Sequence, residues 1–108
     1  ALQAADSYPS RPIRMIVAYP PGGGTDQVGR VMAEQLTQTL GQQVVIDNRG
    51  GATGNIGTEL AARAAPDGYT LLMGAGSELL IRNLLQPTPT AEPMRPYTPI
   101  SLIGAGPM

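Results

Sequence analysis

The 108-residue chain contains no cysteine and no histidine, and these two absences exclude several kinds of chemistry at once. Without cysteine there is no disulfide, no thiol nucleophile and no thiolate metal ligand. Without histidine, the triads that activate a serine and the commonest zinc sites lose a central residue. Any chemistry would have to rest on carboxylates, hydroxyls and the backbone, so we expect neither a catalytic residue nor a metal or cofactor.

Lysine is absent too, and the positive charges are seven arginines against eight acidic residues, for a formal net charge of -1. No basic run is long enough to neutralise a row of phosphates, which argues against nucleic-acid binding. No apolar run approaches the roughly 20 residues that a membrane-spanning helix needs. The length predicts a single compact domain.

What the chain has in quantity is glycine and proline, 14 and 11 residues, clustered between apolar segments. Strands are expected at 13–18, 43–47 and 69–74, with a fourth at 100–104. Helices are expected after the glycine run up to a C-terminal cap at Gly41, at 55–65 and at 78–85. Because a helix separates successive strands, the pattern predicts an α/β fold with a mainly parallel sheet in a three-layer α-β-α sandwich.

Each of the first two expected helices has an apolar stripe that should face the sheet. In the first helix the stripe consists of Val28, Val31, Met32, Leu36 and Leu40, with Arg30, Glu34, Thr37 and Gln38 on the other side. In the second helix it consists of Ile56, Leu60, Ala61 and Ala64.

Two loops of small residues follow the first and third strands, "YPPGGGTD" at 19–26 and "GAGSE" at 74–78. Ligands of open parallel sheets bind beyond the carboxyl ends of the strands, where neighbouring connections leave toward opposite faces. If the first strand is central, that point lies between these two loops. Each loop also opens a helix, whose first N–H groups and positive dipole end favour an anion.

The residue types in these loops favour a carboxylate held by amides and hydroxyls. Glycines let an anion approach the main chain, and Thr25 and Ser77 add hydroxyl groups. The alternative is a tight turn at Gly22 to Gly24 with Thr25 or Asp26 as helix N-cap, and Asp26 is more often a cap than a base. Glu78 has a less obvious role, because a carboxylate beside an anion site repels anions.

Two other functions remain open at this point. A nucleotide-binding enzyme domain is the first, but a P-loop needs a lysine, and in a G-x-G-x-x-G pattern Gln27 replaces the third glycine after Gly22 and Gly24. A purely structural or interaction domain is the second. In that case substitution of Thr25 would change stability but no ligand affinity.

Four motifs carry a family resemblance over residues 8 to about 76: P-x-[RK]-P-I, P-P-G-G-G-T-D, G-x-x-G-N-I-G-T and A-P-D-G-Y-T-L. This stretch closely resembles the N-terminal part of the tripartite tricarboxylate transporter receptors, the Bug or TctC-like family of extracytoplasmic solute-binding proteins. The resemblance implies a periplasmic, two-lobed binding protein of type II without enzymatic activity. Such a receptor captures small carboxylates for a membrane transporter.

When the family's ligand-binding positions are transferred to this sequence, the resemblance implies that the ligand contacts the loops at 19–26 and 74–78. It implies ligand-binding residues Tyr19, Gly23, Gly24, Thr25 and Asp26 in the first loop and Gly76, Ser77 and Glu78 in the second. The stretch 78–97 departs from the family pattern, so the ligand cannot be copied across. Glu78 hints at an amine-bearing or otherwise less anionic ligand.

Family members are about three times as long, which divides the chain as follows. Residues 1–8 are expected to be a flexible N-terminus, either the remnant of a removed secretory signal or a disordered end. Residues 9–108 are expected to be the N-terminal part of the first lobe, without the second lobe and the C-terminal return. Because such a lobe exposes apolar surface and a strand edge, we expect self-association into dimers or higher oligomers.

Overall fold

The computed structural model describes residues 8–51, 54–74 and 100. Their helices and strands are, in order, β1 (Ile13–Val17), α1 (Gly24–Leu40), β2 (Val44–Asn48), α2 (Asn55–Arg63) and β3 (Thr70–Met73). These elements confirm the predicted order, with boundaries that differ by a few residues at most. The helix expected at 78–85 and the fourth strand, apart from Ile100, lie outside the described residues.

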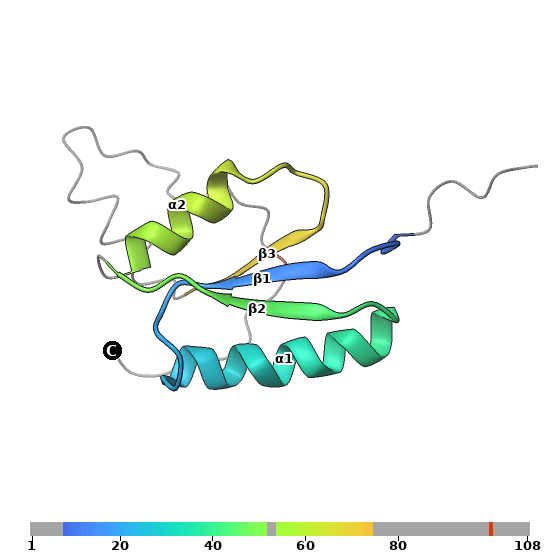
Figure 1. Ribbon diagram of the computed structural model, residues 1–108, viewed down its shortest axis with the longest axis horizontal. Helices are drawn as coiled ribbons and strands as arrows, with labels where there is room; N and C mark the ends of the chain where they lie inside the picture. The colour runs from blue at the N-terminus through green and yellow to red at the C-terminus, as the bar shows by residue number, and fades with distance from the viewer. Residues whose placement is uncertain (1–7, 52–53, 75–99, 101–108) are drawn as a thin grey trace, which may run out of the picture.

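The three strands form one parallel sheet in the order β2-β1-β3, so β1 is central, which is the condition on which the expected ligand position depended. Ile13 pairs with Val44 on one side, and Arg14 pairs with Thr70 on the other. The helices cover opposite faces of the sheet, with α1 below and α2 above (Figure 1). The α/β architecture predicted from the sequence is therefore confirmed.

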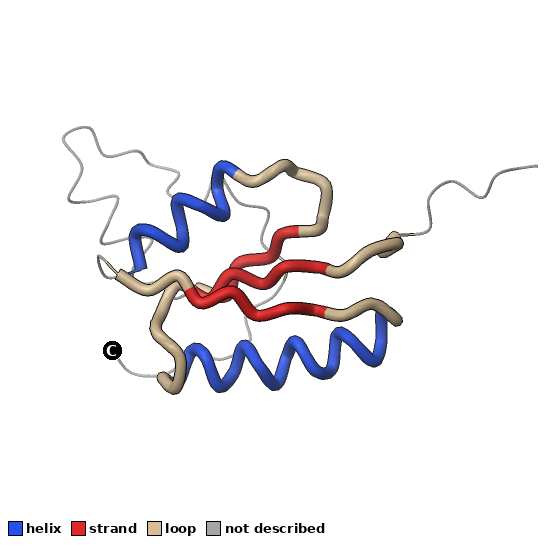
Figure 2. Tube along the Cα trace, viewed as in Figure 1, coloured by secondary structure: helices blue, strands red, loops and turns tan. Residues whose placement is uncertain are grey.

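Beyond the carboxyl ends of β1 and β2, both connections leave the sheet at the same end, drawn in tan in Figure 2. β3 ends at this edge as well, because Met73 pairs with Val17, the last residue of β1. Residue 74 thus follows β3 directly beside the start of the loop after β1. Residues 75–78 lie outside the described residues, so the meeting of the loops that follow β1 and β3 stays a prediction.

The core is centred on β1, which is buried on both faces as its apolar sequence predicts. Ile13, Met15 and Val17 pack toward α1 in a cluster with Ala33 and Val44. On the other face Ile16 and Ala18 are fully buried. The central strand is therefore a fixed support for the loop that follows it.

The prediction for the buried face of α1 was wrong at several positions. Val28 and Val31 are 42% and 61% exposed, whereas Gly29 and Ala33 are buried. A Cβ atom on Gly29 would lie 3.1 Å from Val17 Cγ2, so small residues let the helix backbone lie close to the sheet. Apolar periodicity does not reveal such a contact, because glycine contributes no hydrophobic side chain to the pattern.

Thr37 also differs from its predicted place on the polar face of α1, because it is half-buried. Its hydroxyl donates to the carbonyl oxygen of Ala33 at 2.7 Å and accepts from the N–H of Val44 at 3.0 Å. A threonine that bonds backward along its helix can face the interior without an unsatisfied hydroxyl. Thr37 thereby ties the C-terminal half of α1 to the start of β2.

The buried face of α2 follows the same principle. Ile56 was expected in the apolar stripe but is 54% exposed, and Gly57 and Thr58 are buried instead. A Cβ atom on Gly57 would lie 2.8 Å from the Cα of Ala18, so the helix backbone touches the strand end itself. Leu60 is half-buried, in agreement with its predicted place.

A cluster at the opposite end of the sheet fixes the chain before β1. The Tyr8 hydroxyl donates to the Gly68 carbonyl, and the rings of Tyr8 and Tyr69 meet edge to face at 5.1 Å. The Arg11 guanidinium lies 3.8 Å above the Tyr69 ring and 3.1 Å from the Asp67 carboxylate. This cluster lies at the amino ends of the strands, away from the predicted ligand edge.

Candidate functional site

We call residues 19–26, between β1 and the first turn of α1, the first glycine loop. Gly23 is the N-cap of α1, with φ -76° and ψ 173°, and no side chain caps the helix. The expectation that Thr25 or Asp26 is the N-cap was therefore wrong, since both lie inside the first turn. A serine, threonine, aspartate or asparagine at the N-cap would accept a hydrogen bond from this turn, and glycine leaves it open.

The first helical hydrogen bond of α1 runs from the N–H of Gln27 to the Gly23 carbonyl oxygen, at 3.0 Å. Among the described residues, the N–H groups of Gly24, Thr25 and Asp26 have no hydrogen-bond acceptor. These three donors follow one another at the positive end of a 17-residue helix. Such a turn is suited to an anion.

The glycines of this loop differ in what the fold requires of them. Gly22 has φ 95°, in the left-handed region that favours glycine. A Cβ atom on Gly24 would meet no described heavy atom within 4 Å, and one on Gly23 would meet only Pro20 O at 3.9 Å. Conformation explains Gly22, whereas packing against the described residues explains neither Gly23 nor Gly24.

Asp26 is only 2% exposed, and three donors occupy its carboxylate. Oδ2 accepts from the Gly22 N–H and from Arg30 Nε, each at 2.9 Å, and Oδ1 accepts from Asn48 Nδ2 at 2.8 Å. The side chain thus binds the fold, while the main-chain N–H of the same residue points out of the first turn without an acceptor in the described part of the chain.

The ionisation of Asp26 follows from these contacts. The hydrogen bond from Asn48, together with those from the Gly22 N–H and Arg30, lowers the pKa of Asp26 to about 2. The carboxylate is therefore charged at neutral pH, and the Arg30 guanidinium at 2.9 Å compensates the charge. This ion pair offsets the repulsion that a lone carboxylate would exert on an anion at the helix N-terminus.

Sequence reasoning missed Asn48, the last residue of β2. Its Nδ2 donates to the Tyr19 carbonyl oxygen at 3.1 Å as well as to Asp26, and its Oδ1 accepts from Arg30 Nη2 at 3.2 Å. The available signal was a polar residue at the carboxyl end of a strand next to the central strand. Without the register of β1 and β2, that residue was indistinguishable from a solvated strand end.

Asp47 lies near the carboxyl end of β2, and Arg49 directly follows the strand. In the structure they pair, since Arg49 Nε donates to Asp47 Oδ1 at 2.9 Å, and Arg14 Nε donates to Asp47 Oδ2 at 2.6 Å. Burial raises the pKa of Asp47, but the hydrogen bonds from Arg14 and Arg49 outweigh it and hold the pKa below its usual value. This cluster shares no hydrogen bond with the first glycine loop among those between described residues.

The structure brings five of the sequence-predicted site residues together at the carboxyl edge: Tyr19, Gly23, Gly24, Thr25 and Asp26. The remaining three, Gly76, Ser77 and Glu78, lie outside the described residues. In the described part of the chain, no group of three or more acidic residues, histidines or cysteines could hold a metal ion. Of the described helices, none has both the length and the apolar character to cross a membrane.

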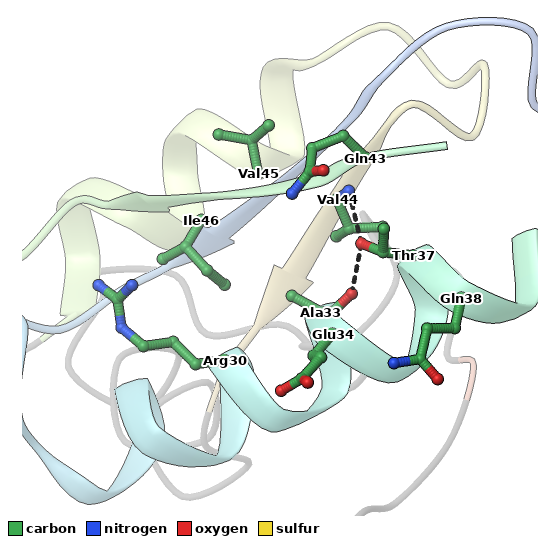
Figure 3. A pocket seen from close by; sticks show the side chains of 9 residues that line it. All are labelled: Arg30, Ala33, Glu34, Thr37, Gln38, Gln43, Val44, Val45 and Ile46. Atoms are coloured by element: carbon green, nitrogen blue, oxygen red, sulfur yellow. Dashed lines mark hydrogen bonds between the residues drawn. The ribbon is translucent and has the colours of Figure 1, made fainter. Parts of the chain in front are cut away.

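A separate hollow lies between α1 and β2, along the outer side of β2 (Figure 3). Its lining consists of Arg30, Ala33, Glu34, Thr37, Gln38, Gln43, Val44, Val45 and Ile46. None of the sequence-predicted site residues is among them, and Arg30 is the one residue that it shares with the Asp26 contacts. We therefore place the candidate site at the first glycine loop and not in this hollow.

Comparison with known proteins identifies the family of the chain. The family model for the tripartite tricarboxylate transporter family receptor matches residues 28–108. Protein BugT of Bordetella pertussis is 47% identical over 106 residues, which cover 97% of this chain and 32% of BugT. The chain thus spans about a third of the length of the curated relatives that it matches.

Two solved structures of similar proteins contain dicarboxylates. Rpa4515 of R. palustris, solved with adipate, is 35% identical with a TM-score of 0.70, covering 80% of this chain and 29% of its own. MatC of Rhodopseudomonas palustris, solved with bound malate, is 40% identical with a TM-score of 0.58, covering 60% of this chain and 22% of its own. Both similarities include sequence as well as fold.

Proposed function

The chain belongs to the tripartite tricarboxylate transporter receptor family, and from that premise we propose that it binds a small carboxylate-containing solute at the first glycine loop. The observation that carries the proposal is the first turn of α1. Three successive N–H groups there lack an acceptor among the described residues, at a helix whose N-cap is glycine. A carboxylate supplies the acceptors that this turn lacks.

The loop residues have distinct parts in this proposal. The open N–H groups of Gly24, Thr25 and Asp26 donate to the carboxylate oxygens, and the Thr25 hydroxyl adds a fourth donor. Gly23 and Gly24 keep side chains out of the space in which the carboxylate lies, which is open in the described structure. Tyr19 borders the loop on the β1 side, and its hydroxyl is a candidate donor to the solute.

Gly76, Ser77 and Glu78 complete the proposed site from the loop after β3. The pairing of Met73 with Val17 supports this part of the proposal, because it brings residue 74 next to the start of the first glycine loop. We assign the Ser77 hydroxyl to the solute. Glu78 favours a solute that carries an amine or has few negative charges.

The class of ligand is supported by two members of the same fold. Adipate and malate are small dicarboxylates, and the proteins solved with them are 35% and 40% identical to this chain. We therefore propose a receptor and not an enzyme. Its place is outside the cytoplasmic membrane, where it delivers the solute to the membrane subunits of a tripartite tricarboxylate-type transporter.

Self-association is a further part of this proposal. Apolar side chains on three elements are exposed in the described structure: Val31 by 61% on α1, Val45 by 49% on β2 and Ile56 by 54% on α2. In the described sheet β2 and β3 lie at the edges, and an edge strand can pair with another copy of the chain. Sedimentation velocity of residues 1–108 should therefore give a dimer or larger species, and a folded, monodisperse monomer would reject the idea.

The ligand proposal is tested by isothermal titration calorimetry on the receptor that carries this sequence at its full natural length. The panel contains mono-, di- and tricarboxylates, with and without an amine, and NAD and ATP as controls. We expect heat and saturation with at least one carboxylate and none with the nucleotides. No response to any carboxylate, or saturable binding of a nucleotide alone, would contradict the proposal.

A further inference from the structure

Three side chains beneath the first glycine loop form a closed ring of hydrogen bonds. Arg30 Nε donates to Asp26 Oδ2 at 2.9 Å, Arg30 Nη2 donates to Asn48 Oδ1 at 3.2 Å, and Asn48 Nδ2 donates to Asp26 Oδ1 at 2.8 Å. Two of these residues belong to α1 and the third ends β2. The ring therefore joins the start of the helix to the neighbouring strand.

The ring is also hydrogen-bonded to the main chain of the loop at two places. The Gly22 N–H donates to Asp26 Oδ2 at 2.9 Å, and Asn48 Nδ2 donates a second hydrogen bond to the Tyr19 carbonyl oxygen at 3.1 Å. The two prolines lie between these attachment points. Both ends of the turn are thus held by side chains that do not belong to the turn itself.

Asn48 cannot exchange its two amide atoms without losing these contacts. A carboxylate is an acceptor only, so Asp26 requires the NH₂ group of Asn48, as does the Tyr19 carbonyl. Arg30 is a donor only and requires the carbonyl oxygen of Asn48. With the amide reversed, acceptors would face acceptors at Tyr19 and Asp26, and donors would face each other at Arg30.

The loop offers few other means of support in the described structure. Gly22, Gly23 and Gly24 are exposed and have no side chains with which to pack. A close contact with the second connection exists at Pro20, because a Cβ atom on Gly50 would lie 3.0 Å from Pro20 Cδ. This contact limits how far Pro20 can move but does not set the direction of the helix N–H groups.

We propose that Asn48 is a positioning residue for carboxylate binding, whose amide orients the N–H groups of residues 24–26 by fixing the Tyr19 carbonyl and the Asp26 carboxylate. The inference rests on the proposed function of the first glycine loop. It adds a residue from β2 that does not itself touch the solute. Because Asn48 orders the loop before the solute binds, the free-energy cost of ordering the loop does not reduce the affinity.

The test compares single and paired substitutions in the full-length receptor by calorimetric titration with malate, adipate or whichever carboxylate of the panel binds. Asn48→Ala removes the hydrogen bonds to the Tyr19 carbonyl oxygen and to the Asp26 carboxylate, and it should weaken binding by about tenfold or more. Asn48→Asp should weaken binding further, since it places a second carboxylate against Asp26. The double variant Asp26→Asn with Asn48→Asp restores one donor and one acceptor and should recover part of the affinity.

Thr37→Val is the matched control for stability. It removes two hydrogen bonds of a half-buried side chain at the other end of α1, those to Ala33 and Val44, and leaves the loop untouched (Figure 3). We expect a lower free energy of unfolding with an unchanged Kd. Asn48→Ser keeps one hydroxyl in place and serves for the titration if Asn48→Ala does not fold.

Wild-type affinity in Asn48→Ala, or in Asn48→Ser where it is used, would overturn the positioning role while the proposed function stands. Equal weakening by Thr37→Val would overturn it as well, because general destabilisation would then explain the loss. A double variant no better than Asn48→Asp would contradict the hydrogen-bond pattern of the ring. Absence of carboxylate binding in the wild type would remove the proposed function and this inference together.

Discussion

The two connections at the carboxyl edge of the sheet are both rich in glycine, yet the fold uses their glycines differently. We call residues 49–57, from the end of β2 into the first turn of α2, the second glycine loop. Packing or backbone conformation explains each of its described glycines. Gly57 touches Ala18, and Gly50 approaches Pro20. Gly51 and Gly54 have φ values of 122° and 85°.

In the first glycine loop only Gly22 is at a position where the backbone conformation favours glycine, with φ 95°. Gly23 and Gly24 have ordinary backbone conformations and open space where a side chain would be. A glycine that neither conformation nor packing requires indicates a position kept clear for something else. The comparison supports the proposed ligand site at the first glycine loop through the glycines that the fold leaves unexplained, and not through the number of glycines.

The largest effect on stability is expected at Gly57. In Gly57→Ala the new Cβ would lie 2.8 Å from the Ala18 Cα and 3.0 Å from the Arg49 carbonyl oxygen, both backbone atoms. We expect a loss of about 1–3 kcal/mol in the free energy of unfolding, typical of overpacking. Urea unfolding measures this free energy, with Gly24→Ala as the control. An equal loss of stability in both variants would contradict the difference between the two loops.

Next in size is the contrast between the two helix N-caps. Gly54 caps α2 with φ 85°, whereas Gly23 caps α1 with φ -76°. Gly54→Ala should cost about 1–2 kcal/mol of stability, because a left-handed conformation is unfavourable for alanine. Gly23→Ser should raise stability by about 0.3 kcal/mol, since serine is among the preferred N-caps.

Gly23→Ser should at the same time weaken carboxylate binding, because the new hydroxyl competes for the N–H groups of the first turn. Thermal unfolding of Gly54→Ala and Gly23→Ser tests the expected changes in stability, and calorimetric titration of the same variants tests the expected change in carboxylate affinity. A serine variant that binds the solute as well as the wild type would contradict the assignment of these N–H groups.

A smaller effect on stability is expected at acidic pH, because a carboxylate supports the first glycine loop, whereas steric packing supports the second. The folded-state pKa of Asp26 is about 2, below its usual 3.8, so its stabilising contribution is complete above pH 3.8. The contribution is lost as the pH falls through about 2. We expect the free energy of unfolding to depend less on pH over this interval in Asp26→Asn than in the wild type.

Urea unfolding from about pH 5 down to about pH 2 measures the free energy of unfolding of both proteins. The other carboxylates are the same in both, so their contributions cancel in the difference between the two curves. Gly57→Ala should run parallel to the wild type over the same interval, since steric packing does not titrate. Parallel curves for Asp26→Asn and the wild type would show that the buried carboxylate does not hold the loop in the way described.

The element order and the burial of β1 could be read from the sequence because they depend on patterns that residues carry individually. An apolar, β-branched run on both faces marks a buried central strand, and glycine after Leu40 marks a helix end. Both indications are local. The structure confirms them, with Gly41 in the left-handed conformation that ends α1.

The helix faces and Asn48 could not be predicted in this way, because they depend on what lies opposite. Gly29 and Gly57 are buried since a strand approaches the helix backbone there, which hydrophobic periodicity does not record. The contacts of Asn48 require the register of β2 against β1 and the reach of Arg30 across one helical turn. Neither quantity is present in a single sequence.

The most direct measurement of the central claim compares Gly24→Pro with Gly24→Ala in the full-length receptor by calorimetric titration with the carboxylate that binds the wild type. Gly24 is the first helical residue of α1, where proline is tolerated and only its N–H group is lost. Alanine adds a side chain but keeps the N–H group. Both variants should be at least as stable as the wild type.

If the open N–H groups of the first glycine loop hold the carboxylate, Gly24→Pro should lose about 1.5–3 kcal/mol of binding free energy, which is about tenfold to hundredfold in Kd. Gly24→Ala should lose distinctly less. Equal Kd values for Gly24→Pro and Gly24→Ala, in two folded proteins, would contradict the account.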